Sequence, residues 1–319
     1  MVFAIFMVLG AISCALSIRQ WLRIVANDQK KMVLALHFSY PFIFAADRGQ
    51  MHLLIGYLFA LGLTYVVNAQ SDGKILARGQ WALGAAFSIK LYPSFLFAFL
   101  PRFWSLAKWK FLIVSLLGFL LMTALLKPSG FSSFFVGIDS ANLFNSSDYF
   151  VSTLQYNTSL KALFFNLDFI TPGTFRFTDN FLIKYQLMFY VLYCIAVTFL
   201  IQNKIFRVDE KILVGAILSI SISPIAGTYC QTIVASCALC SLIQYQNISN
   251  FRRRFYLLVV MVSIVPFNLS LFPWLDTRYL YFQSTVVPLV QHAFVITMCW
   301  ISLAQFFSRK SFKKFKLAE

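Results

Sequence analysis

The chain has 319 residues, of which 60% are hydrophobic and 12% are charged, and its mean hydropathy is +0.75. This composition excludes a soluble globular domain and predicts an integral membrane protein. The formal net charge of +16 does not indicate nucleic-acid binding, because the basic residues form short clusters between apolar stretches, as they do in cytoplasmic loops.

Apolar segments follow one another along the whole chain, and several are close to the roughly 20 residues that a transmembrane helix needs. They lie at 2–18, 32–46, 50–68, 80–101, 111–126, 181–202, 212–226, 228–246, 256–272 and 283–307. The first segment has neither the charged start nor the small-residue cleavage site of a signal peptide. We therefore expect it to be retained as a helix.

Basic clusters separate these segments, at 19–31, 74–78, 102–110, 204–211, 252–254 and 309–316. The positive-inside rule places them, and hence the C-terminus, in the cytoplasm. Segment 80–101 then has cytoplasmic clusters at both ends but is too short to cross the bilayer twice. We expect a re-entrant hairpin that turns near Lys90–Pro93. The alternative is a single crossing, which would place the clusters at 252–254 and 309–316 outside.

The predicted fold class is all-α: a polytopic integral membrane bundle of about nine spanning helices plus the re-entrant hairpin. We expect a single transmembrane domain over residues 1–319. Segment 127–180 has no spanning pattern and is rich in aromatic residues, and this topology makes it a non-cytoplasmic loop. Its Phe-rich stretches suggest helices that lie in the headgroup plane.

A polar stretch, Asp47-Arg48-Gly49-Gln50, precedes the apolar helix predicted at 50–68. Asp47 or Gly49 can be explained as a helix N-cap, but a cap does not account for Arg48 and Gln50. In a functional interpretation, Arg48 holds a phosphate in bidentate fashion and Gln50 hydrogen-bonds to a sugar or pyrophosphate. Both interpretations stay open at this point.

Lys90 interrupts an apolar run, and Pro93 breaks the helix three residues later. Most lysines in membrane segments extend their amine to the interface. At the turn of a hairpin that faces the bundle interior, the amine would instead hold an anionic headgroup. The sequence favours this second role.

Further polar residues have simple structural explanations beside functional ones. Asn157-Thr158-Ser159 can cap a helix that starts at Leu160, and Ser223-Pro224 can be a helix break ahead of Tyr229. Cys237 and Cys240 have C-x-x-C spacing, but on a helix they are better explained as small packing residues than as a redox pair. No cluster has the spacing of a metal site.

Four of these stretches, in order, resemble the motifs of glycosyltransferase family 87, polytopic enzymes of the GT-C superfamily. They are Gly49-Gln50-Met51-His52, Lys90-Leu91-Tyr92-Pro93, Asn157-Thr158-Ser159 and Ser223-Pro224-Ile225. His52 stands where the family usually has Asn, and the family's His after the last motif is replaced by Ala226-Gly227-Thr228-Tyr229. The first outer loop, which carries the catalytic carboxylate in GT-C enzymes, has no counterpart here.

The resemblance implies transfer of a hexose, most often mannose, from a polyprenyl-phosphate sugar donor to a glycan or glycolipid acceptor. Transfer would occur on the non-cytoplasmic face of the cell inner or plasma membrane, among membrane lipids, and without a metal or cofactor. Inverting transfer needs a carboxylate as general base and cations for the departing lipid phosphate. The implied base is Asp47; the implied substrate-binding residues are Arg48, Gln50, Lys90, Tyr92, Asn157, Ser223 and Tyr229. The alternatives are a catalytically inactive homologue or a component of a lipid-linked glycan transporter or polymerase.

Overall fold

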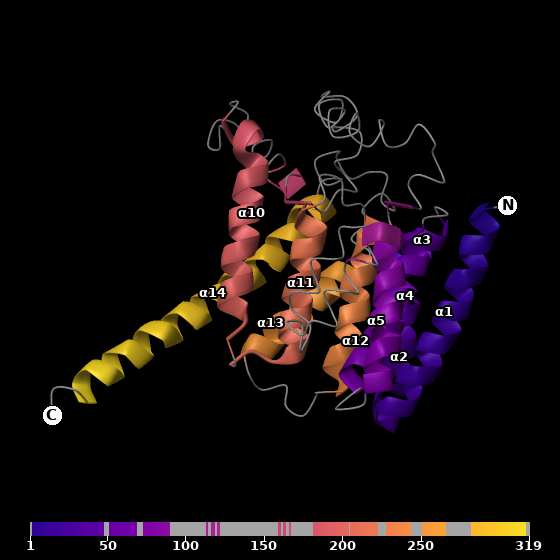
Figure 1. The fold of residues 1–319 in the computed structure, drawn as a ribbon, viewed down its shortest axis with the longest axis horizontal. Coiled ribbons are helices and arrows are strands. Elements are labelled where there is room, and N and C mark those ends of the chain that lie inside the picture. The colour runs from indigo at the N-terminus through magenta and orange to yellow at the C-terminus, as the bar shows by residue number, and fades with distance from the viewer. Residues whose placement is uncertain are drawn as a thin grey trace.

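The computed structural model describes most of the chain in separate stretches, together with isolated positions within 113–121 and 159–166. The stretches are 2–47, 51–68, 73–89, 181–203, 205–222, 228–243, 251–265 and 282–316. Every regular element in them is a helix (Figure 1). This confirms the predicted all-α class for the described residues.

The helices of the first half are α1 (Val2–Ile24), the short 3-10 helix η1 (Asn27–Gln29), α2 (Lys30–His37), α3 (Tyr40–Asp47), α4 (His52–Asn68) and α5 (Gly73–Ile89). Those of the second half are α10 (Phe181–Ile201), α11 (Val208–Ile222), η4 (Thr228–Gln231), α12 (Thr232–Ile243), α13 (Phe251–Ile264) and α14 (Phe282–Lys316).

The apolar segment predicted at 32–46 is divided into two helices, α2 and α3, of eight residues each. The break lies at Phe38 and Ser39. Pro41 has no backbone N–H, and in a continuous helix its ring would clash with the carbonyl of His37, whereas it is tolerated in the first turn of α3. Ser39 closes the break by donating its hydroxyl to the carbonyl of Leu36 at 2.9 Å. Each helix is only about 12 Å long, so neither crosses a bilayer alone.

Helix α5 begins at Gly73, seven residues before the apolar segment predicted at 80–101, and it includes Lys74 and Arg78 of the basic cluster. Its 17 residues span about 26 Å, which is close to the thickness of a bilayer core. The helix that precedes Lys90 is therefore longer than the apolar stretch before it. The predicted turn at Lys90–Pro93 lies outside the described residues.

Helix α4 lies inside the bundle and packs against α1, α3, α5 and α12. Two glycines bring α4 and α5 together: a Cβ on Gly79 would lie 2.9 Å from the carbonyl oxygen of Gly62. On another side of α4, a Cβ on Gly56 would lie 2.8 Å from the Cβ of Thr232, and Ser236 donates a hydrogen bond to the Gly56 carbonyl at 2.9 Å. Small residues with hydroxyl-to-carbonyl contacts are how helices approach closely in membranes.

Short connections make neighbouring helices antiparallel, and Figure 1 shows the result. The end of α1 and the starts of α2, α5, α11 and α13 lie at one end of the bundle. We call it the basic end, because the described cations at these positions include Arg23, Lys30, Arg78, Arg207 and Arg252. The end of α3 and the start of α4 lie at the opposite end.

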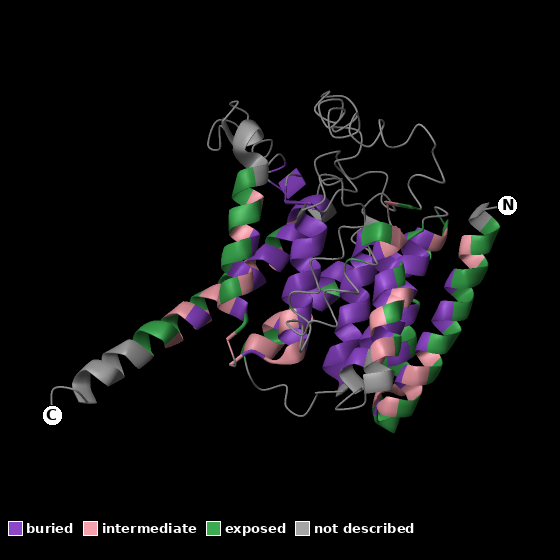
Figure 2. Cartoon of the chain, viewed as in Figure 1, coloured by how far each residue is buried: buried purple, intermediate pink, exposed green. Residues whose placement is uncertain are grey.

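The outer faces of the bundle are apolar. Figure 2 shows exposed residues along the outer sides of α1 and α10 and buried residues through the middle. Leu192, Ile195 and Phe199 on α10 are 54%, 60% and 83% exposed. Among the residues that the structure describes, two helical stretches are long and apolar enough to cross a bilayer, Ala4–Ile24 in α1 and Ser284–Ser308 in α14.

Candidate functional site

Two of the motif regions meet in the structure. His52 opens α4 and is buried, and its Nε2 lies 3.6 Å from the Sγ of Cys230, a residue 178 positions further along the chain. Cys230 belongs to η4, which packs against both α3 and α4. The end of α3 that carries Asp47 and the η4 turn that contains Tyr229 therefore belong to the same end of the bundle.

A row of buried polar side chains continues from this contact across the bundle interior. Gln231, the neighbour of Cys230, accepts a hydrogen bond through Oε1 from Nε2 of Gln291 on α14 at 2.7 Å. The same Gln291 nitrogen donates to the hydroxyl of Ser263 on α13 at 2.8 Å. The amide of Gln291 thus joins η4, α13 and α14, and all three side chains are buried.

The next residue of α14, His292, extends the row to α11 and α10. Its Nε2 lies 2.9 Å from the hydroxyl of Ser221, which itself donates to the carbonyl of Ile217 at 2.7 Å. Because that hydroxyl has a single hydrogen, Nε2 of His292 is the donor in the first contact. Nδ1 then accepts from the hydroxyl of Tyr193, 3.0 Å away. This pattern assigns a neutral imidazole with both nitrogens hydrogen-bonded.

We call this row the polar belt. It consists of His52, Cys230, Gln231, Ser263, Gln291, His292, Ser221 and Tyr193. Its hydrogen bonds run between its own members and nearby carbonyls, and buried hydrogen bonds between helices favour one arrangement of those helices. Through His52–Cys230 and Gln231–Gln291 the belt joins η4 to α4 and to α14.

Two of the predicted site residues lie in the part of the chain that the structure describes, and the other six do not. Asp47 is the last residue of α3 and is exposed, and the backbone of Tyr229 lies within η4. The other predicted substrate-binding positions lie outside the described residues: Arg48, Gln50, Lys90, Tyr92, Asn157 and Ser223. Near the helix predicted to start at Leu160, the described positions 160, 162, 163 and 166 are helical, and the Ser159 hydroxyl accepts from the backbone N–H of Ala162 at 3.2 Å.

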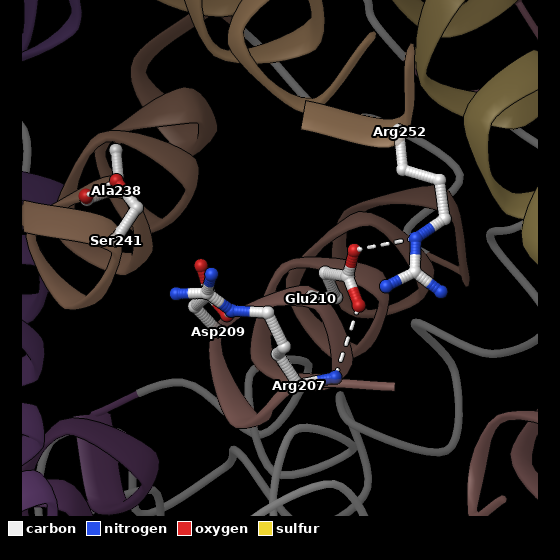
Figure 3. Close-up of polar contacts among 6 residues, drawn as sticks. All are labelled: Arg207, Asp209, Glu210, Ala238, Ser241 and Arg252. Atoms are coloured by element: carbon white, nitrogen blue, oxygen red, sulfur yellow. Dashed lines mark hydrogen bonds and ion pairs between the residues drawn. The ribbon is translucent and has the colours of Figure 1, made fainter. Parts of the chain in front are cut away.

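A second polar cluster lies at the basic end, where α11 and α13 begin (Figure 3). Glu210 reaches back to accept from the backbone N–H of Arg207 at 2.9 Å, which caps α11 in the manner of a capping box. Its other oxygen faces Nε of Arg252 on α13 at 3.5 Å. The Arg207 side chain donates through Nε to Asp209 at 3.1 Å. The guanidinium of Arg252 also lies 5.8 Å from the ring centre of Phe206.

Both carboxyls of this cluster are almost fully buried, with Asp209 3% and Glu210 5% exposed. Burial raises the pKa of Asp209, while the guanidinium groups of Arg207 and Arg253 oppose the change. Burial likewise raises the pKa of Glu210, against the hydrogen bond from the Arg207 backbone and the charge of Arg252. In both cases the loss of hydration outweighs the neighbouring cations.

Sequence reasoning treated the basic clusters around 204–211 and 252–254 only as cytoplasmic loops and missed this ion-pair cluster. A signal was available, because Val208-Asp209-Glu210-Lys211 is an acidic pair inside a basic stretch and just ahead of an apolar run. Acidic residues in a first helical turn match the helix dipole and mark a helix start. The polar belt left no such signal, because its members are one or two residues at a time, spread over distant parts of the sequence.

Among the residues that the structure describes, no group of three or more His, Cys, Asp or Glu side chains is placed to hold a metal ion. Cys237 and Cys240 are both buried in the core that α11 and α12 share, as free thiols. Comparison of the chain with protein-family models, with curated proteins and with solved structures gives no match.

Proposed function

We propose that the chain is a multi-pass membrane glycosyltransferase of the GT-C type. It transfers mannose, or another hexose, from a polyprenyl-phosphate carrier to a glycan or glycolipid on the non-cytoplasmic face. The observation that supports this proposal best is the contact at 3.6 Å between His52 and Cys230. It joins the regions of two motifs of the family 87 resemblance at the end of the bundle away from the basic end.

The membrane placement rests on the distribution of polar and apolar side chains. Soluble monomers rarely expose large contiguous apolar surfaces, yet α1, α10 and α14 each carry a row of exposed large hydrophobic residues. The interior contains the polar belt, and the cations named above for the basic end mark the face expected in the cytoplasm. The C-terminal end of α14 then belongs to the cytoplasmic side.

In this proposal Asp47 is the general base that takes the proton of the acceptor hydroxyl. The described acids are Asp28, Asp47, Asp209 and Glu210, and of these only Asp47 lies at the end of the bundle where the two motif regions meet. The remaining residues act on the donor and acceptor: Arg48 and Lys90 on the lipid phosphate, with Gln50, Tyr92, Asn157, Ser223 and Tyr229 on the sugars.

A second candidate function is a non-catalytic one, in which the chain is an inactive homologue or a component of a lipid-linked glycan transporter or polymerase. The observation that favours it is the exposure of Asp47. A general base is usually held in a partly desolvated site that tunes its pKa toward working pH.

The test is donor turnover by the purified full-length chain with polyprenyl-phosphate mannose in membranes that contain acceptor. We expect any transfer to fall by about 100-fold or more in Asp47→Asn, because general bases contribute about that factor. The matched control is Asp28→Asn, an exposed acid at the basic end, which should leave turnover unchanged.

Transfer that is undiminished in Asp47→Asn would show that another acid is the base. Binding of the donor with no turnover in the unmodified chain would favour the non-catalytic function instead. The two outcomes are distinguished by measuring donor binding and donor consumption on the same preparation.

A further inference from the structure

The side-chain amide of Gln291 lies where η4, α13 and α14 meet, and both of its hydrogen atoms are used. The hydroxyl of Ser263 on α13 donates to the carbonyl of Val259 at 2.7 Å, so it accepts from Nε2 of Gln291 at 2.8 Å. The second hydrogen of Nε2 goes to Oε1 of Gln231, 2.7 Å away, in the last residue of η4. One orientation of the amide therefore bonds two elements from α14.

The next residue, His292, fixes the rotation of α14 at this level. Its ring contacts Ser221 on α11 at 2.9 Å and Tyr193 on α10 at 3.0 Å. Successive residues of a helix point about 100° apart, so these two contacts hold Gln291 toward η4. Ser221 lies in the last turn of α11, and η4 is the next element that the structure describes. Neighbouring residues of α14 are thus bonded to the end of α11 and to η4.

Helix η4 is contacted on another side by α4, which carries part of the first motif. Nε2 of His52 lies 3.6 Å from Sγ of Cys230, and η4 also packs against α3, whose last residue is Asp47. The backbone of Tyr229, a predicted substrate-binding residue, lies in η4 beside Cys230. A displacement of η4 would therefore move Tyr229.

We propose that Gln291 is a positioning residue: its amide holds η4 against α14 and so sets the place of Tyr229 relative to the sugar. The role of Tyr229 rests on the proposed function, whereas the hold on η4 rests on the contacts alone. Polar side chains that bond across helices favour one packing of those helices in a membrane. A displacement of about 1 Å at a reacting site can cost about 100-fold in rate, so a fixed η4 is of direct use to transfer.

The experiment uses the full chain with Cys230 as its single cysteine and measures how fast N-ethylmaleimide modifies it in detergent. Cys230 is 1% exposed, so this rate reports how often η4 leaves its place. Gln291→Leu removes the amide and keeps an apolar side chain of similar size. We expect the rate to rise roughly tenfold, because a buried hydrogen bond shifts a local opening equilibrium by about that factor. An unchanged rate would overturn the proposal.

Two controls separate the hold on η4 from general loosening. Ser263→Ala removes the bond from the same amide to α13 and should leave the rate at Cys230 unchanged. A chain whose single cysteine is Cys237, in α12 and 0% exposed, should react equally slowly with and without Gln291→Leu.

If Gln291→Leu unfolds the chain and both cysteines react, a second variant decides. Gln231→Met with Gln291→Met leaves neither amide of the pair without its partner, so the chain should fold. It should raise the rate at Cys230 and not at Cys237. Equal changes at the two cysteines in this variant would overturn the proposal.

Donor turnover on the same preparations tests the role of Tyr229. We expect Gln291→Leu to lower kcat/KM for polyprenyl-phosphate mannose by about 10- to 100-fold, and Ser263→Ala to leave it unchanged. When Tyr229→Phe is already present, Gln291→Leu should cost little more, because the two changes act at one place. Losses that multiply independently, or undiminished transfer in Gln291→Leu, would overturn the proposal. An unmodified chain that never transfers sugar, but whose Cys230 becomes reactive in Gln291→Leu, would refute the proposed function and support the hold on η4.

Discussion

At the scale of single residues, Glu210 combines two opposing effects. Its carboxylate accepts from the backbone of Arg207 and faces Arg252, and both contacts favour the charged form. Burial disfavours that form, and the pKa is raised overall. Breaking a buried ion pair leaves an uncompensated charge, whereas replacing the charged group by a neutral one of the same shape need not be destabilising.

This balance predicts how stability depends on pH. The folded pKa of Glu210 lies above its usual value of 4.5, so the folded state binds the proton more tightly than the unfolded state. The free energy of unfolding should therefore fall as pH rises from about 4.5 through the folded pKa. The total fall is about 1.4 kcal/mol for each pH unit by which the folded pKa of Glu210 exceeds its unfolded pKa. Thermal unfolding in detergent across this range should show a smaller decline in Glu210→Gln, whose amide keeps the capping contact.

The control for this prediction is Asp28→Asn, which removes an exposed acid at the same end of the bundle. It should leave the pH dependence of unfolding as it is in the unmodified chain. An equal decline in the unmodified chain and in Glu210→Gln would show that the buried carboxyl is not the group that titrates.

At the scale of elements, local signals in the sequence predicted some features and not others. Ser39 and Pro41 mark the break between α2 and α3. The prediction of one apolar segment at 32–46 missed this break because it used apolarity alone. Helices α5, α11 and α13 begin four to seven residues before the apolar segments at 80–101, 212–226 and 256–272, because helical hydrogen bonding continues into polar sequence. The polar belt could not be predicted at all: Gln231 and Gln291 are 60 positions apart, and only tertiary packing brings them together.

The close approach of α4 and α5 gives a prediction at this scale. A Cβ on Gly79 would meet the backbone oxygen of Gly62 and the Cβ of Tyr65, both at 2.9 Å. Neither atom is the end of a flexible side chain, so the two helices must separate. Gly79→Ala should therefore cost about 1–3 kcal/mol in the free energy of unfolding, although alanine is the better helix former.

The matched control is Gly10→Ala on α1, where the new Cβ would lie 3.5 Å from Leu53, an ordinary van der Waals distance. There the gain in helix propensity should dominate, and stability should rise by up to about 1 kcal/mol. Denaturation of both variants in the same detergent checks the pair. Equal effects at the two positions would mean that the α4–α5 contact does not limit stability.

At the scale of the whole molecule, composition predicted an all-helical chain, while the candidate site depended on short motifs. The structure brings two motif regions together through His52 and Cys230. Lys90 and Asn157 lie outside the described residues, so their roles stay predictions. Apolar periodicity identifies helices because burial acts on every residue of a segment. A site residue is a single side chain whose partners are distant in sequence, and periodicity says nothing about it.

Orientation is the last property of the whole molecule that can be tested. If the basic end is cytoplasmic, single cysteines at Asn27 in η1 and at Ser308 in α14 should react with an impermeant thiol reagent only after permeabilisation of cells. A cysteine at Met51, at the opposite end and 38% exposed, should react in intact cells. The native cysteines, which are buried or half-buried, are replaced in this background.

A fourth position, Ser105, decides between the two readings of segment 80–101. Helix α5 runs from the basic end toward the end that carries His52, so a chain that turns at Lys90–Pro93 must return for Ser105 to share the side of Asn27. Under the hairpin, a cysteine at Ser105 is therefore protected in intact cells, as the one at Asn27 is. Reaction of Ser105 together with Met51 would mean a single crossing.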